Sequence, residues 1–218
     1  MTVSQANRCS TLYCGTGFHI RAGNGDPVCA RRMMSNPEDD VYFSTNRLML
    51  GTRVAHFADI GLTEGGMRML VNPNAGGSSK YSEILSYEIL RSMYAARLVW
   101  SEMELRYFPA GGKITDYSAE VFGHYVGVSV ARAMKFRGTF VETDALRLLQ
   151  KKLYGINCSS ATVVGSFHKQ ILHLLAEHEY IADVLQRVYP RLDPELRRNT
   201  IVIVTVVKDA PWVYYNKY

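Results

Sequence analysis

The chain has 218 residues, a formal net charge of +5 at pH 7 and 47% apolar residues. This length and apolar content are enough for one packed domain and exclude a chain that is disordered throughout. The small positive charge is far below that of a histone-like polycation. It permits nucleic-acid binding, but an ordinary solvated basic surface also explains it.

The first residues lack the basic and apolar segments of a secretory leader. The longest strongly apolar run covers residues 201–207, whereas a helix that crosses a bilayer needs about 20 residues. We therefore expect an intracellular protein, in the cytoplasm or the nucleus, with no membrane partner. The cysteines are expected to be free thiols in a reducing compartment: Cys9, Cys14, Cys29 and Cys158.

The N-terminal residues 1–40 combine several glycines with three of the cysteines and show no helical period. We predict an irregular N-terminal arm there, followed by a single α/β domain over residues 41–218. The spacing of Cys9, Cys14, His19 and Cys29 matches no common zinc motif, so the role of these cysteines stays open. Residues 41–72 contain apolar pieces broken by glycines, which predicts two or three short strands or turns.

From residue 79 the pattern becomes regular. Ser78 or Ser79 is suited to cap a helix that runs through Ala96, with an apolar stripe at every fourth residue. Three segments rich in strand-forming residues follow at 98–108, 114–122 and 125–134, with glycine-containing turns between them. These segments predict a three-stranded antiparallel meander, with Gly123-His124 as its second tight turn.

The remainder of the chain alternates between helical and strand patterns. Thr143 begins a predicted helix to about Tyr154, and Ser166 begins a longer one to about Val188. A short helix follows Asp193, and the apolar residues 201–207 predict a strand covered on both faces. The last residues are expected to form an edge segment. The predicted class is α/β with a mixed, α+β-like central sheet covered by helices.

This order of elements resembles the αβββαβ core of the PD-(D/E)XK superfamily, the restriction-endonuclease-like nucleases, with the preceding residues as an N-terminal extension. The resemblance covers residues 79–207 and rests on the layout and on acidic positions. In that family an acid on the first helix and an acid on the second strand join an acid-x-lysine pair on the third strand. Together they hold Mg²⁺ over the scissile phosphate.

Two acidic residues match the family pattern. Glu88 falls inside the apolar arc of the first helix, where a carboxylate is costly unless it is paired, metal-bound or protonated. Asp116 lies in the second strand, where aspartate is disfavoured. The resemblance implies that both are catalytic acids and ligands of Mg²⁺ or Mn²⁺, with Glu120 as a third catalytic acid on the same strand face. The alternative is a Glu88 that is paired or reaches water at the rim of the helix and an Asp116 that faces solvent.

The third strand lacks the acid-x-lysine pair. The predicted turn places Asp116 opposite Ala131, so the motif falls on Ser129-Val130-Ala131. Serine and alanine supply neither an anionic ligand nor a cation. Lys152 on the next helix is a candidate for a migrated base, and Glu102 or Glu104 on the first strand is a candidate for completing an acidic cluster.

The resemblance without its motif implies a catalytically degenerate nuclease-fold protein, a pseudoenzyme that binds nucleic acid or acts within a nucleic-acid-processing complex. Five basic residues are candidates for contacts to backbone phosphates, although a solvated face is the alternative: Arg132, Lys135, Arg137, Lys151 and Lys152. Two other functions stay open. One is an active Mg²⁺- or Mn²⁺-dependent nuclease with a rearranged site, and the other is a non-catalytic scaffold for protein partners.

Overall fold

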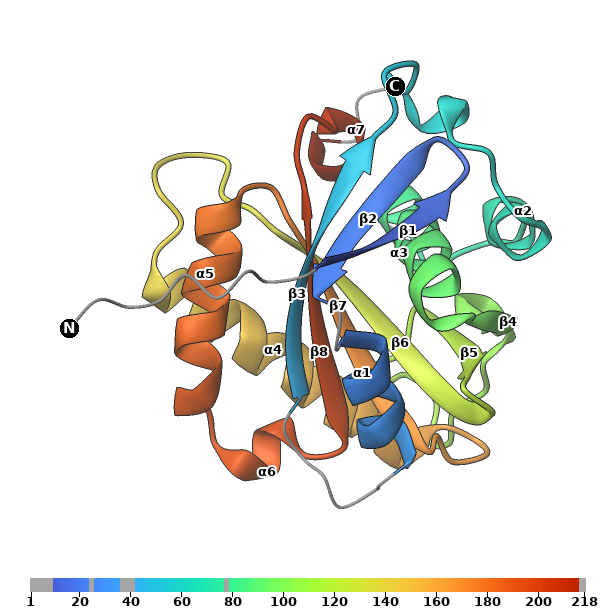
Figure 1. Ribbon diagram of the computed structural model, residues 1–218. Coiled ribbons are helices and arrows are strands. Elements are labelled where there is room, and N and C mark those ends of the chain that lie inside the picture. The colour runs from blue at the N-terminus through green and yellow to red at the C-terminus, as the bar shows by residue number, and fades with distance from the viewer. Residues whose placement is uncertain (1–9, 24–25, 36–41, 77–78, 216–218) are drawn as a thin grey trace.

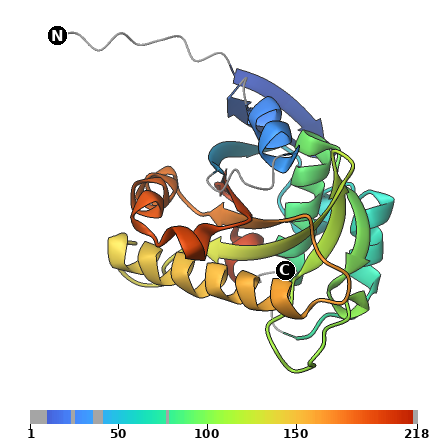
Figure 2. The ribbon, with the colours of Figure 1, turned by 90° about the horizontal axis from the view of Figure 1, so that it is seen from below.

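The computed structural model describes residues 10–23, 26–35, 42–76 and 79–215. An eight-stranded sheet with the strand order β1-β2-β3-β8-β7-β6-β5-β4 runs through the molecule, with helices on both faces (Figures 1 and 2). The predicted α/β class with a mixed sheet is therefore confirmed. No helix among the described residues is both long enough and apolar enough to span a bilayer.

The strands are β1 (Ser10–Gly15), β2 (Phe18–Gly23), β3 (Tyr42–Leu50), β4 (Arg97–Ser101), β5 (Tyr117–Val121), β6 (His124–Ala133), β7 (Lys169–Ala176) and β8 (Thr200–Val207). The helices are α1 (Asp26–Ser35), α2 (Glu64–Val71), α3 (Lys80–Tyr94), α4 (Glu142–Thr162), α5 (Glu179–Val188), α6 (Pro194–Arg197) and α7 (Pro211–Tyr215), with the 3₁₀ turns η1 (Phe57–Asp59), η2 (Glu102–Glu104) and η3 (Tyr189–Arg191).

The four central strands β3, β8, β7 and β6 are parallel to one another. The outer strands β2 and β1 on one side, and β5 and β4 on the other, continue the sheet in antiparallel fashion. Every residue of β7 and β8 is buried. This is expected for parallel strands that are covered on both faces.

Two hydrophobic cores fill the space between the sheet and its helices. One lies under α3, with contributions from α1 and α7, and includes Val128 of β6. The other lies under α4 and α5 and includes Ala131 of the same strand. Residues separated by an odd number of positions along a strand point to opposite faces, so β6 contributes to both cores. The helices α3 and α4 therefore lie on opposite sides of β6 (Figure 2).

A buried chain of hydrogen bonds fixes α3 on the sheet. Ser86 of α3 bonds to Tyr117 of β5 at 2.9 Å and to Nδ1 of His173 on β7 at 2.7 Å. Nε2 of His173 bonds to Thr205 of β8 at 2.8 Å. Burial lowers the pKa of His173 to about 3, so the imidazole is neutral and bridges two neighbours as one donor and one acceptor.

The succession α3-β4-β5-β6-α4-β7 gives an αβββαβ order of elements, but its last strand is β7 and not the predicted strand at 201–207. The predicted helix at 79–96 corresponds to α3, which ends where Ala95 adopts a left-handed conformation with φ of 53°. The predicted meander corresponds to β4, β5 and β6, although β4 is shorter than expected and ends at Ser101. The predicted strand at 201–207 and the short helix after Asp193 correspond to β8 and α6.

The prediction of one helix over residues 166–188 is wrong. The first half is strand β7 and only the second half is helix α5. Because β7 is buried on both faces, its apolar residues are continuous and do not alternate. Such a run fits a buried strand and a buried helix equally well by periodicity alone.

The prediction of an irregular arm over residues 1–40 is also wrong wherever the structure describes it. Residues 10–23 form the hairpin of β1 and β2, and residues 26–35 form α1. In β2 the buried residues Phe18, Ile20 and Ala22 alternate with exposed ones, which is the period of a strand covered on one face. Residues 1–9, 24–25 and 36–40 lie outside the described part of the chain.

Three smaller expectations are corrected as well. Residues 41–72 contain one nine-residue strand, β3, and the helix α2 instead of several short strands. Helix α4 continues past the expected end near Tyr154 to Thr162. The C-terminal tail forms α7, which packs under α3, and not an edge strand.

The turn between β5 and β6 is Phe122-Gly123, one residue earlier than predicted. Both residues have positive φ, 52° and 85°, as a two-residue turn with the twist of a hairpin requires. The pairing of Glu120 with Tyr125 therefore differs from the predicted register by two residues. A shift by two residues leaves every side chain on its predicted face. If the pairing of β5 with β6 is continued by one residue beyond Tyr117 and Val128, Ser129 lies opposite Asp116.

The assignment of β7 to the centre of the sheet predicts a large effect of truncation there. Leu174 is fully buried in the core under α4 and α5, whereas Leu12 on β1 is 53% exposed. We expect Leu174→Ala to lower the free energy of unfolding by about 2 to 5 kcal/mol, because it leaves a cavity in a tightly packed core. Leu12→Ala should change it by less than about 0.5 kcal/mol. Urea denaturation measures both, and equal effects would contradict this strand assignment.

Candidate functional site

The candidate site lies where β5 stops pairing with β6. The ladder between these strands ends at Tyr117 and Val128, so the main-chain groups of Val130 on the same edge need other partners. The Val130 N–H donates to Oδ2 of Asp116 at 2.5 Å. The Val130 carbonyl accepts from Nζ of Lys152 on α4 at 3.1 Å. An acid and an amine from distant parts of the chain thus flank a single residue of β6.

A second acid, Glu83 of α3, lies within electrostatic range of Asp116. Glu83 lies in the first turn of α3 and is only 5% exposed. Burial, together with the charge of Asp116, raises the pKa of Glu83 to about 7. Burial also raises the pKa of Asp116 to about 6, although the positive charge of Lys152 and the Val130 N–H oppose this shift. The two carboxyl groups therefore take up protons close to neutral pH.

A third carboxylate, Glu102, belongs to the turn η2 that follows β4. Its negative charge contributes to the raised pKa values of both Glu83 and Asp116. Oε2 of Glu102 accepts a hydrogen bond from the N–H of Ala75 at 2.6 Å. Glu102 is therefore close enough to act on the pair electrostatically, while one of its oxygens is held by the loop before α3.

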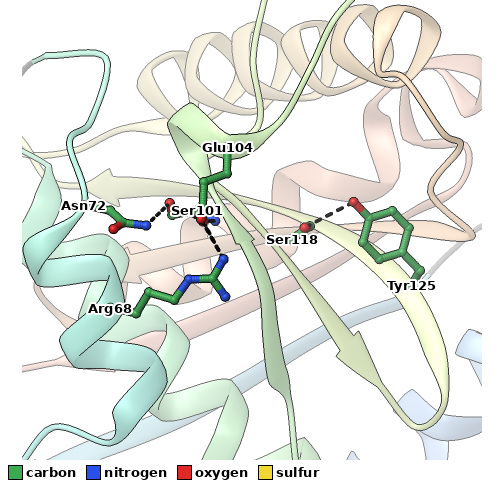
Figure 3. A network of polar contacts seen from close by, with 6 residues as sticks. All are labelled: Arg68, Asn72, Ser101, Glu104, Ser118 and Tyr125. Atoms are coloured by element: carbon green, nitrogen blue, oxygen red, sulfur yellow. Dashed lines mark hydrogen bonds and ion pairs between the residues drawn. The ribbon is translucent and has the colours of Figure 1, made fainter.

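A network of polar contacts holds η2 in place (Figure 3). Glu104 Oε2 accepts from both the N–H and the hydroxyl of Ser101 at 2.8 Å. Arg68 on α2 donates to both carboxylate oxygens of Glu104, at 2.7 and 2.8 Å. Asn72 donates to the Ser101 hydroxyl at 2.9 Å. The turn that carries Glu102 is thereby fixed to α2.

A small cavity of about 120 Å³ opens beside these groups. Its wall is formed by the loop before β5, by β6 and by α4: Lys113, Ile114, Asp116, Ser129, Lys151, Lys152, Gly155 and Ile156. Three lysines and one carboxylate, Asp116, line this space. The excess of positive charge in the cavity favours an anionic ligand beside Asp116.

The donor set suits a hard divalent cation in part. Carboxylate and carbonyl oxygens are the ligands that Mg²⁺ and Mn²⁺ prefer, and Mg²⁺ usually keeps several waters. Glu83, Asp116 and the Val130 carbonyl are oxygen donors at the cluster. Among the described residues no group of three His, Cys, Asp or Glu side chains is placed to hold a metal. A cation here would therefore rely on two carboxylates, a main-chain oxygen and water.

The structure brings Glu83, not Glu88, to Asp116. Glu88 is 3% exposed, and its Oε1 accepts from the N–H and the hydroxyl of Thr63 at 2.9 and 2.8 Å. It thereby caps the start of α2. The two glutamates are five residues apart, about 140° around the helix axis, so they serve different neighbours. Glu120 likewise lies elsewhere, in an ion pair with Arg97 at 2.7 Å.

The five predicted phosphate-binding residues separate into two groups. Lys151 and Lys152 line the cavity at the acid pair. Arg132 instead donates to the carbonyls of Val213 and Tyr214 near the C-terminus, and Lys135 forms an ion pair with Asp144 at 2.7 Å. Arg137 is exposed in the loop after β6.

The cysteines are not assembled into a metal site in the described residues. Cys14 and His19 face each other across β1 and β2, with 3.3 Å between Sγ and Nδ1. Cys29 is exposed on α1, Cys158 is partly buried on α4, and neither forms a disulfide. Cys9 lies outside the described residues.

The chain is similar to the AAC-rich mRNA clone AAC4 protein of Dictyostelium discoideum. The two are 37% identical over 164 residues, which is 72% of this chain but 24% of that protein. The chain thus spans about a quarter of the length of this curated relative. No family model matches the chain. No solved structure matches it either.

The raised pKa values predict how stability varies with pH. Each carboxyl group binds its proton more tightly in the folded state than in the unfolded state, where its pKa is near 4.5 for Glu83 and 3.8 for Asp116. As the pH rises from about 4 to 7, the unfolded chain releases these protons first. The acid pair therefore lowers the free energy of unfolding over this interval, and its effect is constant at higher pH.

Glu83→Gln removes this penalty because an amide resembles the protonated acid. We expect a gain in the free energy of unfolding at pH 8, on the order of 1 to 3 kcal/mol in a metal-free buffer. The gain should vanish near pH 4. Glu195→Gln, at a side chain that is 79% exposed, is the matched control and should show no such trend. Denaturation series between pH 4 and 8 measure the difference, and a gain that does not depend on pH would refute the shifted pKa.

Proposed function

We propose that the chain is a divalent-metal-dependent nuclease with a rearranged site, in which Glu83, Asp116 and Lys152 provide the groups expected of a PD-(D/E)XK-like centre. The observation that carries the proposal is that Asp116 and Lys152 bind the two main-chain groups of Val130 on β6, while Glu83 lies within electrostatic range of Asp116. In this proposal, groups from α3, from the residue before β5 and from α4 take the place of the motif that the third strand lacks.

Each residue has a distinct role in this proposal. Asp116 and Glu83 would hold the cation, and its positive charge would offset the cost of keeping two buried carboxyl groups ionised. A cation held by these residues would supply a water of lowered pKa and would neutralise charge on the phosphate. Lys152 places a positive charge at the developing charge of the phosphoryl oxygens. Lys113 and Lys151, on the wall of the same cavity, contact neighbouring phosphates.

A second candidate function is nucleic-acid binding without cleavage, within a nucleic-acid-processing complex. A specific observation favours it: in the observed register β6 presents Gly127 where the motif has an acid, and the described residues contain no trio of metal-ligating side chains. The lysines around the cavity would then bind backbone phosphates while no water is activated. Both candidate functions require nucleic acid as the ligand, but only the nuclease function requires a metal.

The decisive experiment compares metal binding with cleavage. We expect Mg²⁺ or Mn²⁺ at pH 8 to raise the melting temperature of the native chain, because the cation binds only the folded state. Asp116→Asn should abolish this shift. With labelled single-stranded DNA, double-stranded DNA and RNA as substrates, Asp116→Asn and Lys152→Met should each reduce metal-dependent cleavage by about 100-fold or more.

Glu195→Gln, a distant carboxylate on α6, is the control and should retain both responses. Nucleic-acid binding that is insensitive to metal, with no cleavage of any substrate, would replace the nuclease by the second candidate. Absence of both binding and cleavage would reject the two together.

A further inference from the structure

A second cavity, of about 350 Å³, lies at the far end of α3 and is separate from the acid pair. Arginines from three different elements line it: Arg68 of α2, Arg91 of α3 and Arg97 of β4. Among the lining residues the only carboxylate is Glu64. Three guanidinium groups gathered around one hollow with a single acid point to an anionic ligand.

Two of these arginines are held by partners that do not line the cavity. Arg68 pairs with Glu104 (Figure 3). Its guanidinium lies 5.8 Å from the centre of the Trp100 ring. Arg97 pairs with Glu120 through Nη2 at 2.7 Å. A guanidinium has five N–H donors, and the carboxylate of each pair engages a single nitrogen here. The remaining donors are pre-oriented and available to a ligand.

Arg91 has no ion pair within the described part of the chain. It is exposed in the last turn of α3, and it lines the cavity. The charges of Arg68 and Arg97 are balanced by their carboxylate partners. The charge of Arg91 is not balanced in this way, so it gives the cavity a net positive charge. A planar, permanently charged guanidinium is well suited to binding a phosphate through two parallel hydrogen bonds.

The start of α2 adds main-chain donors on the same side. Gly65 lies in its first turn and lines the cavity, and the first N–H groups of a helix have no partner within the helix. A Cβ at Gly65 would lie 2.2 Å from the Tyr87 hydroxyl, so only glycine lets α2 pack this closely on α3. Helix start and arginines together favour a negatively charged group in the cavity.

The geometry of α3 relates this cavity to the acid pair. Glu83 lies in the first turn of the helix and Arg91 in its last turn. Eight residues of helix span about 12 Å along its axis, which corresponds to a few nucleotides of a nucleic-acid strand. Arg68 also contacts Glu104 in η2, the turn that carries Glu102 toward the acid pair. One strand of nucleic acid is long enough to reach both places.

We propose that Arg68, Arg91 and Arg97 form a phosphate subsite that binds a backbone or terminal phosphate of a nucleic-acid strand, a few nucleotides away from the phosphodiester that lies at Glu83 and Asp116. The identity of the strand as the ligand rests on the proposed function. The affinity of the cavity for phosphate does not, because it requires neither the acid pair nor a metal.

The test measures binding in EDTA, which separates this subsite from the metal-dependent site. Fluorescence anisotropy follows an eight-nucleotide single-stranded DNA with the native chain, with Arg91→Ala and with Arg32→Ala. Arg32 is an exposed arginine on α1, so the control removes the same charge from another surface. We expect Arg91→Ala to weaken binding at least about fivefold more than Arg32→Ala at matched salt. Arg97→Ala provides a second, independent variant, and melting curves confirm that all variants fold.

Two further arms distinguish the source of the phosphate. If inorganic phosphate at millimolar concentration raises the melting temperature of the native chain but not of Arg91→Ala, and competes with the DNA, the subsite is confirmed and also accepts the free ion. If only the DNA shows the Arg91 dependence, the subsite requires a strand. Equal affinities of Arg91→Ala, Arg97→Ala and Arg32→Ala for DNA, with no phosphate-dependent stabilisation, would overturn the proposal. Retained Arg91-dependent binding without metal-dependent cleavage would reject the nuclease function alone.

Discussion

The early end of the pairing between β5 and β6 determines which side chains meet at the candidate site. Main-chain groups in the interior of a protein need partners, and Val130 loses its neighbouring strand when the chain turns away ahead of Tyr117. The side chains of Asp116 and Lys152 take the place of the missing strand. An acid and an amine are thus held at the edge of β6 because buried main-chain N–H and C=O groups need hydrogen-bond partners. Their proximity is a consequence of strand termination, and the surrounding helices then decide which other charges reach that edge.

The two faces of the sheet contribute different partners to this edge. Helix α3 brings Glu83 from one side and helix α4 brings Lys152 from the other. The buried chain from Tyr117 through Ser86 to His173 and Thr205 fixes the position of α3. Because removing a partner from such a network leaves buried polar groups unsatisfied, the position of Glu83 is strongly specified. The position of Glu83 therefore depends on hydrogen bonds between residues far apart in the sequence, which no local sequence motif shows.

Much of the fold was predictable because its signals are local. The apolar stripe of α3, the strand-forming residues of the meander and the β-branched run of β8 each identify an element without knowledge of its neighbours. The failures occurred where tertiary burial removes the periodicity, as in β7, or where a hairpin at the sheet edge alternates over only six residues, as in β2. Asp116 and Lys152 were identified as candidates from their residue types and their places in the element order.

The choice between Glu83 and Glu88 could not be made from the sequence. Both lie on buried positions of one helix, and only the placement of α2 shows that Glu88 serves Thr63. Helix α3 thus carries Glu83 in its first turn and Arg91 in its last, within one continuous rod of hydrogen-bonded backbone. A regular α-helix moves as a rigid body, so its length does not change when it is displaced. Any slide of α3 along the sheet would move Glu83 and Arg91 together, so the separation between these two residues stays constant.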